Sequence, residues 1–331
     1  MRSKRKDEHV TLALRQNVYQ SDFDTIRIIH QSLPNINLSD VDASIQFLGQ
    51  TMKYPIYINA MTGGSEKTEI LNRKLARIAR IFGLPMAVGS QHAALDDPSL
   101  ASSYRVVRDE NPSGFIIGNV GANATVEDAK RAIKMIDANA LGIHINVAQE
   151  IAMDEGDRDF SHWIENITQI VASVDVPVIV KEVGFGMSYK TVAQLYACGV
   201  RHVDVSGRGG TNFVWIENER SQGKRYNYLS DWGITTVESL IMTKSYQEKC
   251  NIFASGGIQN PLDAMKCLIL GAQAVGISGY FLKAAHLESD AMLEEVSMFL
   301  EDFKKLMVLV GAKTIKELPN VEYTIHGKEV Q

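Results

Sequence analysis

Residues 138–150, ANALGIHINVAQE, hold the pattern that decides the fold. Their first part is apolar at almost every position, as in a strand of a parallel sheet that is covered on both faces. The run does not end on the Gly, Pro or Ser of an ordinary turn. It ends in His144, Asn146, Gln149 and Glu150, an imidazole, two amides and a carboxylate, all of which can bind ligands. A buried strand that ends in such groups is typical of an α/β protein whose site lies at one edge of the sheet.

Similar apolar runs recur along the chain, separated by segments with helical spacing. The eight predicted strands are PIYINA (55–60), PMAVG (85–89), GFIIGN (114–119), LGIHIN (141–146), PVIVKE (177–182), HVDVSG (202–207), IFASGG (252–257) and AVGIS (274–278). This alternation predicts a (β/α)8 TIM barrel. We expect a single domain over residues 1–331, with an N-terminal extension (1–54), the barrel (55–285) and a C-terminal helix and tail (286–331). A doubly wound open sheet is the structural alternative.

The segments between the strands carry helix signals. Residues 68–83 place an apolar stripe on one face of a helix that stops at Gly83; the stripe consists of Ile70, Leu71, Leu75, Ile78 and Ile81. Thr125 is suited to cap a helix that begins with acidic residues. Asn260 and Pro261 together are typical of a helix start.

Composition excludes several classes of function. The chain has 34 Lys and Arg against 39 Asp and Glu, a net charge of −5, so we expect no nucleic-acid surface. No apolar run approaches the roughly 18–20 residues that span a bilayer, and no secretory leader is expected, because the charged N-terminus has no apolar segment behind it. The three cysteines show no CxxC spacing. A soluble protein of the reducing cytoplasm is the simplest expectation.

The ends of the predicted strands are rich in polar residues and glycine, and in a barrel the site lies at these ends. The last three loops contain SGRGG, SGG and SG, in which backbone N–H groups can approach a phosphate. Lys181 ends an apolar run and needs an anionic or electron-rich partner, which is either Glu182 or a ligand such as a flavin. Glu150 is a candidate ligand for Mg²⁺.

Several short motifs together resemble the type 2 isopentenyl-diphosphate isomerases. In chain order they are RKDEH (5–9), NAMTGGS (59–65), VGSQ (88–91), HINVAQE (144–150), EGDRDF (155–160), KEVGFGMS (181–188), DVSGRGGTNF (204–213) and ASGGI (254–258). Members of this family are FMN-dependent, Mg²⁺-requiring barrels of isoprenoid biosynthesis. The resemblance implies interconversion of isopentenyl diphosphate and dimethylallyl diphosphate, with reduced FMN as the acid–base group.

The resemblance also implies a role for individual residues. It assigns the substrate to Arg5, Lys6, His9 and Gln149, Mg²⁺ to Glu150, and the lining of the catalytic pocket to His144, Asn146 and Gln149. FMN would be held by Ala60, Met61, Thr62, Ser90, Asn119, Lys181, Ser206 and Thr211, and its phosphate by Gly257, Ile258, Gln259, Ser278 and Gly279. NADPH would be needed only to reduce the flavin. His92 and Gln259 stand where many members have Arg, which puts those two phosphate contacts in doubt.

Other functions remain open at this stage. An FMN-dependent α-hydroxy-acid oxidase shares the expected barrel, but it needs a His paired with an Arg in the later loops, and Arg208 has no such His nearby in the sequence. A flavin- or phosphate-binding barrel without turnover is the non-enzymatic alternative. Family members form homo-tetramers or homo-octamers, so the N-terminal arm could cover its own barrel or that of a neighbour.

Overall fold

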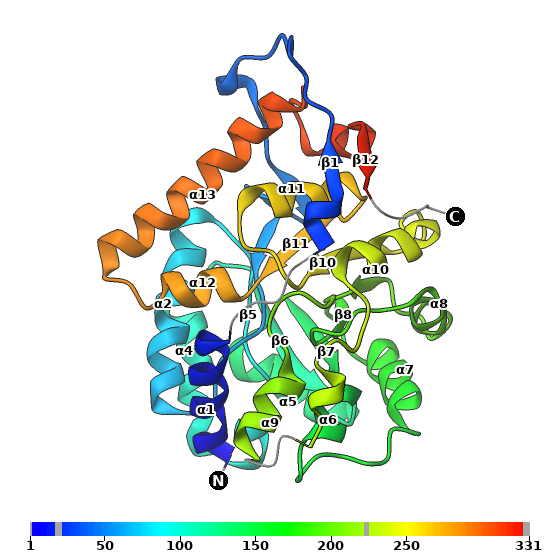
Figure 1. Ribbon diagram of the computed structural model, residues 1–331. Coiled ribbons are helices and arrows are strands. Elements are labelled where there is room, and N and C mark those ends of the chain that lie inside the picture. The colour runs from blue at the N-terminus through cyan, green and yellow to red at the C-terminus, as the bar shows by residue number, and fades with distance from the viewer. Residues whose placement is uncertain (1, 17–21, 222–224, 327–331) are drawn as a thin grey trace.

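The computed structural model describes residues 2–16, 22–221 and 225–326. Its centre is a closed barrel of parallel strands, shown in Figure 1, which confirms the predicted (β/α)8 fold. Around the barrel the strands are β4 (Ile56–Ile58), β5 (Met86–Ala87), β6 (Ile116–Gly121), β7 (Ala140–Ile145), β8 (Val178–Glu182), β9 (His202–Asp204), β10 (Asn251–Ser255) and β11 (Ala274–Ile277). Each of the eight predicted runs overlaps one of them, because buried parallel strands are marked by continuous apolar sequence.

Helices surround the barrel and cover the outer face of its strands (Figure 1). They are α2 (Glu66–Phe82), α4 (Ser102–Glu110), α5 (Val126–Ile136), α7 (Trp163–Ser173), α8 (Tyr189–Ala197), α10 (Thr236–Met242), α11 (Pro261–Ile269), α12 (Gly279–Ala284) and α13 (Ser289–Leu309). The predicted caps are confirmed: Thr125 accepts from Asp128 N, Asn260 accepts from Asp263 N, and Gly83 ends α2 with φ of 66°. The predicted stripe on α2 is too broad, because Ile70 and Ile81 are exposed.

A hairpin in the N-terminal extension closes one end of the barrel. It consists of β2 (Ile45–Phe47) and β3 (Gln50–Met52). The Phe47 ring stacks on Phe253 at 5.2 Å between ring centroids and meets the edge of Phe115 at 5.3 Å. This plug covers the N-terminal ends of the strands.

Segments from the N-terminal extension and from the C-terminal part pair outside the barrel. β1 (Ile26–Ile28) pairs with β12 (Tyr323–Ile325) in an antiparallel ladder, so the C-terminal segment expected to be a tail contains a strand. The amphipathic N-terminal stretch forms α1 (Arg2–Arg15), which lies near α9 (Phe213–Arg220) and α6 (Val147–Ala152) in Figure 1. Both α6 and α9 are short helices in loops that follow barrel strands, and α1 contacts α9.

Candidate functional site

A cavity of about 380 Å³ opens among the loops at the C-terminal ends of the strands. Every residue predicted for the site lines it, from all eight strand ends and from α1. These residues are Arg5, Lys6, His9, Ala60, Met61, Thr62, Ser90, Asn119, His144, Asn146, Gln149, Glu150, Lys181, Ser206, Thr211, Gly257, Ile258, Gln259, Ser278 and Gly279. His92, which replaces a commoner Arg, also faces the cavity. The fold therefore gathers residues that are up to 274 positions apart in the sequence (Arg5 to Gly279).

Lys181 and Ser206 form a polar wall of the cavity at the ends of β8 and β9. The Lys181 Nζ donates hydrogen bonds to Ser206 Oγ at 2.8 Å and to the Glu182 carbonyl oxygen at 2.6 Å. Ser206 has φ of 39°, a conformation that few residues other than glycine adopt. Its backbone N–H donates a hydrogen bond to Asp204 Oδ1 at 3.1 Å, which fixes the strained turn.

A buried carboxylate, Asp204, ties together three of the strands beneath the cavity. It accepts hydrogen bonds from Tyr57 Oη at 2.6 Å, Asn59 Nδ2 at 3.0 Å and Ser255 Oγ at 2.7 Å. These donors come from β4, the residue after it, and β10, so the network fixes three loops that line the cavity. Asp204 lies within its predicted strand (202–207) and ends β9, but no local pattern in the sequence identifies its partners.

His144 stands at the end of β7 with its ring turned toward the cavity. Its Nδ1 lies 3.0 Å from Asn119 Oδ1, while the Asn119 amide nitrogen donates to the Val88 carbonyl oxygen at 3.1 Å. The Asn119 oxygen is therefore an acceptor, and Nδ1 of His144 carries the hydrogen. Burial, together with the charges of Lys6 and Lys181, lowers the pKa of His144 to about 3, so the ring is neutral at physiological pH.

The amides and the carboxylate of the opening stretch form one cluster after β7. Asn146 Nδ2 donates to Glu150 Oε1 at 2.9 Å and to Gln149 Oε1 at 3.1 Å. The other carboxylate oxygen of Glu150 accepts from the backbone N–H of Asp157 at 2.9 Å. The side chains that the sequence places within five residues thus hold one another in position toward the cavity.

The partner of Gln149 is Glu217 of α9, a residue that the sequence did not single out. Gln149 Nε2 donates to Glu217 Oε1 at 3.1 Å, and His9 Nε2 lies 3.0 Å from the same oxygen. The carboxylate of Glu217 is only 1% exposed. Burial works against its ionisation, yet the contacts to His9, Gln149 and Arg220 hold its pKa below the ordinary value. The one available signal was its position in a helix directly after the glycine-rich SGRGG loop.

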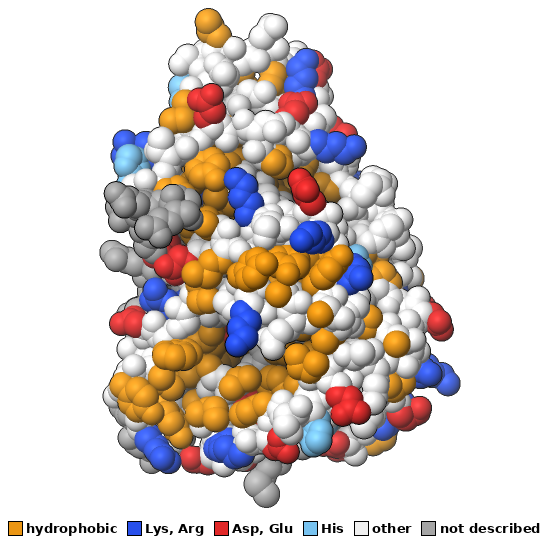
Figure 2. All heavy atoms as spheres, turned by 90° about the vertical axis from the view of Figure 1, so that its right-hand side faces the viewer, with side chains coloured by type: hydrophobic (Ala, Val, Ile, Leu, Met, Phe, Trp, Pro, Cys, Tyr) orange, Lys and Arg blue, Asp and Glu red, His pale blue; other side chains and the backbone are white. Residues whose placement is uncertain are grey.

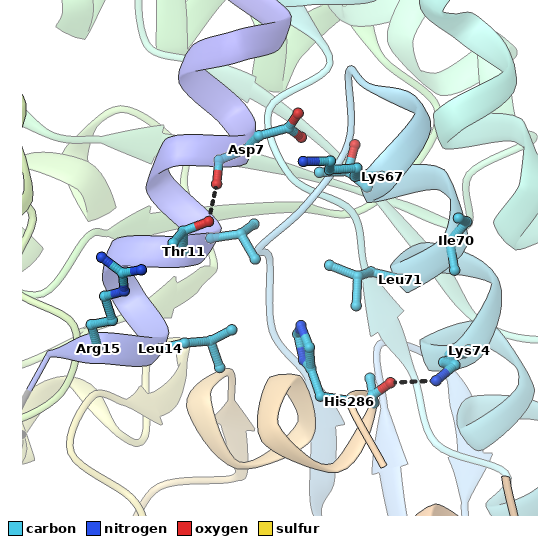
Figure 3. A pocket seen from close by; sticks show the side chains of 12 residues that line it. Asp7, Thr11, Leu14, Arg15, Lys67, Ile70, Leu71, Lys74 and His286 are labelled. Carbon is cyan, nitrogen blue, oxygen red and sulfur yellow. Dashed lines mark hydrogen bonds between the residues drawn. The ribbon is translucent and has the colours of Figure 1, made fainter. Parts of the chain in front are cut away.

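Helix α1 is the roof of the cavity and has a second hollow on its outer side. Figure 3 shows this groove between α1 and α2, with His286 at its base. Its volume is about 470 Å³. Val10 and Leu14 of α1 line both the cavity and the groove. The helix is therefore bordered by open space on two sides and covers its own barrel.

The residues present fit an FMN molecule. Apart from Glu150 and the histidines, the charged side chains that line the cavity among the described residues are cationic. They are Arg5, Lys6, Lys181 and Lys283. Gly257 has φ of 77°, and a side chain added to Gly279 would meet no atom within 4 Å, so these loops leave backbone N–H groups open to a phosphate. Lys181 supplies a cation at the polar wall, as the electron-rich edge of a flavin requires.

The residues fit Mg²⁺ only in part. No group of three or more His, Cys, Asp or Glu side chains suited to a metal occurs among the described residues. Glu150 contributes a single carboxylate at the cavity surface. Because Mg²⁺ in proteins is often held by one or two carboxylates together with substrate phosphates and water, Glu150 can hold the ion jointly with a bound diphosphate.

Comparison with known proteins places the chain in a family. The family model of the FMN-dependent dehydrogenases matches residues 121–324. The isopentenyl-diphosphate delta-isomerase of Staphylococcus saprophyticus subsp. saprophyticus is 52% identical over 331 residues, which covers 99% of this chain and 95% of the relative. The isopentenyl-diphosphate delta-isomerase of Latilactobacillus sakei subsp. sakei is 52% identical over 324 residues, with 96% and 92% coverage.

Solved structures of other proteins resemble this chain in fold. A mandelate oxidase structure with an FMN adduct has a TM-score of 0.67 at 17% identity, covering 96% of this chain and 92% of that chain. At this identity the likeness concerns the barrel and not the reaction. The chain belongs to the type 2, FMN-dependent family of isopentenyl-diphosphate delta-isomerases.

Proposed function

We propose that the protein interconverts isopentenyl diphosphate and dimethylallyl diphosphate in isoprenoid biosynthesis. The observation that carries this proposal is the single cavity, in which the predicted flavin residues and the predicted diphosphate residues face the same space. Family membership supports the same reaction, because the relatives are named for it. The reaction moves a double bond by adding one proton and removing another, and it is redox-neutral overall.

The diphosphate would lie beneath α1. Arg5, Lys6 and His9 line the cavity there, as do Gln149 and Glu150, and His9 and Gln149 share Glu217 as a partner. In this arrangement the cations and a Mg²⁺ ion on Glu150 neutralise the diphosphate, while Gln149, held by Glu217, faces the hydrocarbon end. Binding energy from the diphosphate then positions the alkene, which has no polar group of its own.

Reduced FMN supplies the acid–base group and an electron-rich ring beside the alkene. The chain's own contribution is to hold that ring with Ala60, Met61, Thr62, Ser90, Asn119, Lys181, Ser206 and Thr211, and its phosphate with the loops at 257–259 and 278–279. His144 is a weak base in this pocket, because burial, together with neighbouring charges, lowers its pKa to about 3. NADPH serves only to reduce the flavin before turnover, and a cytoplasmic location would provide it.

The test is the reaction itself. Purified protein with FMN, a reductant, Mg²⁺ and isopentenyl diphosphate should yield dimethylallyl diphosphate, followed by proton NMR in D₂O. Oxygen consumption with lactate or glycolate would instead identify an α-hydroxy-acid oxidase. Binding of FMN and diphosphate without isomerisation would leave a non-catalytic flavin barrel.

The Mg²⁺ assignment has its own test in Glu150→Gln. The variant should bind Mg²⁺ and diphosphate about tenfold more weakly, because it loses the one carboxylate at that end of the cavity, and should keep the yellow FMN spectrum. Isothermal titration with inorganic pyrophosphate and Mg²⁺ measures the first effect. Glu165→Gln, on the outer surface of α7, is the control. Unchanged pyrophosphate affinity at low Mg²⁺ would argue against a metal at Glu150.

A homo-tetramer or homo-octamer is the proposed assembly. Figure 2 shows hydrophobic side chains gathered on the face that carries α7, α8 and α10. Ile164, Tyr189 and Met242 are exposed hydrophobic residues on these three helices, and exposed apolar patches often mark interfaces. Light scattering after size-exclusion chromatography tests this, and a monomer at micromolar concentration would exclude it.

None of the helices in the described ranges has the length and apolar character of a membrane span.

A further inference from the structure

Arg220, the last residue of α9, lies where three segments meet beside the cavity. Its Nε donates to Glu8 of α1 at 3.2 Å, and its Nη2 donates to Glu155, in the loop after α6, at 3.2 Å. Its Nη1 donates to Glu217 of α9 itself. The side chain is 17% exposed, so these ion pairs are partly shielded from water and are stronger than pairs on an open surface.

Each of these carboxylates is connected to a residue that faces the cavity. Glu217 also contacts His9 and Gln149. Glu155 accepts a hydrogen bond from Arg5 at 3.5 Å, a longer contact than its bond to Arg220. Because Arg220 shares Glu155, Arg5 is only partly neutralised and keeps charge for a bound diphosphate. Glu8 lies on α1 itself, one turn from the residues that face the cavity.

Helix α1 has other attachments, because it also contacts α2 and α12. The groove in Figure 3 separates much of its outer side from α2. Asp7 accepts from Ser65 Oγ at 2.6 Å, and Gln16, after the end of the helix, accepts from the backbone N–H of Asn212 at 2.9 Å. Val10 and Leu14 pack against the main core and also border the cavity and the groove. Arg220 adds a polar attachment, because it binds Glu8 of α1 and also Glu155, the partner of Arg5.

We propose that Arg220 is a positioning residue that fastens α1 over the cavity and thereby sets the affinity for the diphosphate group. Without its guanidinium, three carboxylates from three segments would lose the cation that they share, and Arg5 would remain at Glu155 and His9 at Glu217. Like charges at such distances repel, so the roof would loosen where it meets the substrate. The guanidinium suits this place because it donates from three separate nitrogens in a fixed plane, whereas the three donors of an ammonium sit on one rotating nitrogen. The proposal builds on the proposed diphosphate site and adds a residue outside the cavity lining to it.

The first test measures amide hydrogen exchange in α1 without any ligand. Hydrogen–deuterium exchange followed by mass spectrometry should show amide exchange in residues 5–15 about tenfold faster in Arg220→Gln than in the parent protein. Arg73→Gln removes an exposed pair with Glu69 on α2 and should leave exchange in α1 unchanged. Because this measurement uses neither substrate nor cofactor, a failed isomerase assignment would not affect it.

The second test measures affinity and turnover. In Arg220→Gln the dissociation constant for inorganic pyrophosphate with Mg²⁺ and the KM for isopentenyl diphosphate should each rise about tenfold, with kcat changing less and FMN affinity within about twofold. Arg220→Lys keeps the charge and should recover only a small part of the loss. Complete recovery by Lys would mean that net charge, and not the three-way contact, is responsible.

Two results would overturn the proposal. One is a folded Arg220→Gln protein whose α1 exchange and pyrophosphate affinity equal those of the parent. The other comes from the variant Glu8→Gln, which replaces Arg220→Gln if that protein does not fold. Glu8→Gln removes the direct tie to α1 from a half-exposed position, so it should fold and show a smaller change in the same direction. No change in α1 exchange in Glu8→Gln would then reject a fastening role for Arg220.

Discussion

At the scale of single residues, Lys181 shows how one side chain links strand and site. Its aliphatic stem ends an apolar strand, and its ammonium is held by Ser206 Oγ and the Glu182 carbonyl oxygen. These two oxygens carry no full charge and leave the ammonium facing the cavity. We interpret this geometry as a cation kept ready for an electron-rich ligand, here the proposed FMN.

Replacing Lys181 by Met should therefore weaken FMN binding. The variant keeps the shape of the stem and loses the charge, so we expect the FMN dissociation constant to rise about tenfold or more, equivalent to about 1.4 kcal/mol. Quenching of flavin fluorescence on titration measures it. Lys190→Met, on the exposed side of α8, controls for the loss of a positive charge. Equal affinities in the two variants would remove Lys181 from the flavin site.

The buried ring of His144 leads to a prediction about how folding stability depends on pH. In the unfolded chain its imidazole binds a proton near pH 6.5, whereas burial lowers its pKa in the folded protein to about 3. As pH falls between these values the unfolded state binds more protons, so the folded state loses stability. His144→Gln removes this loss. Because the ring also borders the open cavity, we expect the variant to gain about 2 kcal/mol relative to the parent between pH 7 and pH 4, measured by urea unfolding of the FMN-free proteins. Parallel stability curves would show that His144 titrates normally.

At the scale of elements, the hairpin β2–β3 and helix α1 close opposite ends of the barrel by different means. The hairpin inserts an aromatic ring into the barrel, where it packs against other rings. Helix α1 is attached by ion pairs and hydrogen bonds at its edges as well as by Val10 and Leu14 against the core. Dense apolar packing suits a permanent seal, whereas polar attachments around a cavity allow a ligand to enter.

Phe47→Ala should consequently destabilise the barrel without changing the site. Removal of a fully buried ring leaves a cavity and costs about 3–5 kcal/mol. Leu33→Ala in the same N-terminal extension is the matched control, because Leu33 is 87% exposed and should change stability by less than about 0.5 kcal/mol. Urea denaturation measures both, and FMN affinity in the folded Phe47→Ala protein should match that of the parent. A cost similar to that of Leu33→Ala would mean that the hairpin is not part of the core.

At the scale of the whole molecule, the cavity draws on all eight strand ends, so a ligand that fills it should stabilise the entire barrel. At a free FMN concentration of about 100 times its dissociation constant, we expect unfolding to cost about 2.7 kcal/mol more than without FMN. Thermal denaturation monitored by circular dichroism measures the rise in Tm. Mg²⁺ alone should not raise Tm, because Glu150 offers one carboxylate only. A rise with Mg²⁺ alone would reveal a metal site that does not depend on diphosphate.

Much of this architecture was predictable because its signals are local. Continuous apolar runs marked the buried strands, and Thr125, Asn260 and Gly83 marked helix ends through contacts within a few residues. The lining of the cavity followed as well, because a closed parallel barrel brings all strand ends to one rim. The extent of the α2 face was less predictable. Ile70 and Ile81 fit the helical period but lie outside the area that neighbouring elements cover.

The sequence by itself determined the period of strands and helices, the barrel that this period requires and the rim residues that the barrel gathers. Only the tertiary structure decided that α1 covers its own barrel, that Gln149 pairs with Glu217, and that Arg220 joins Glu8 to Glu155. The physical reason is distance along the chain. Contacts between residues separated by tens to hundreds of positions depend on how whole elements pack, and no short-range periodicity encodes them.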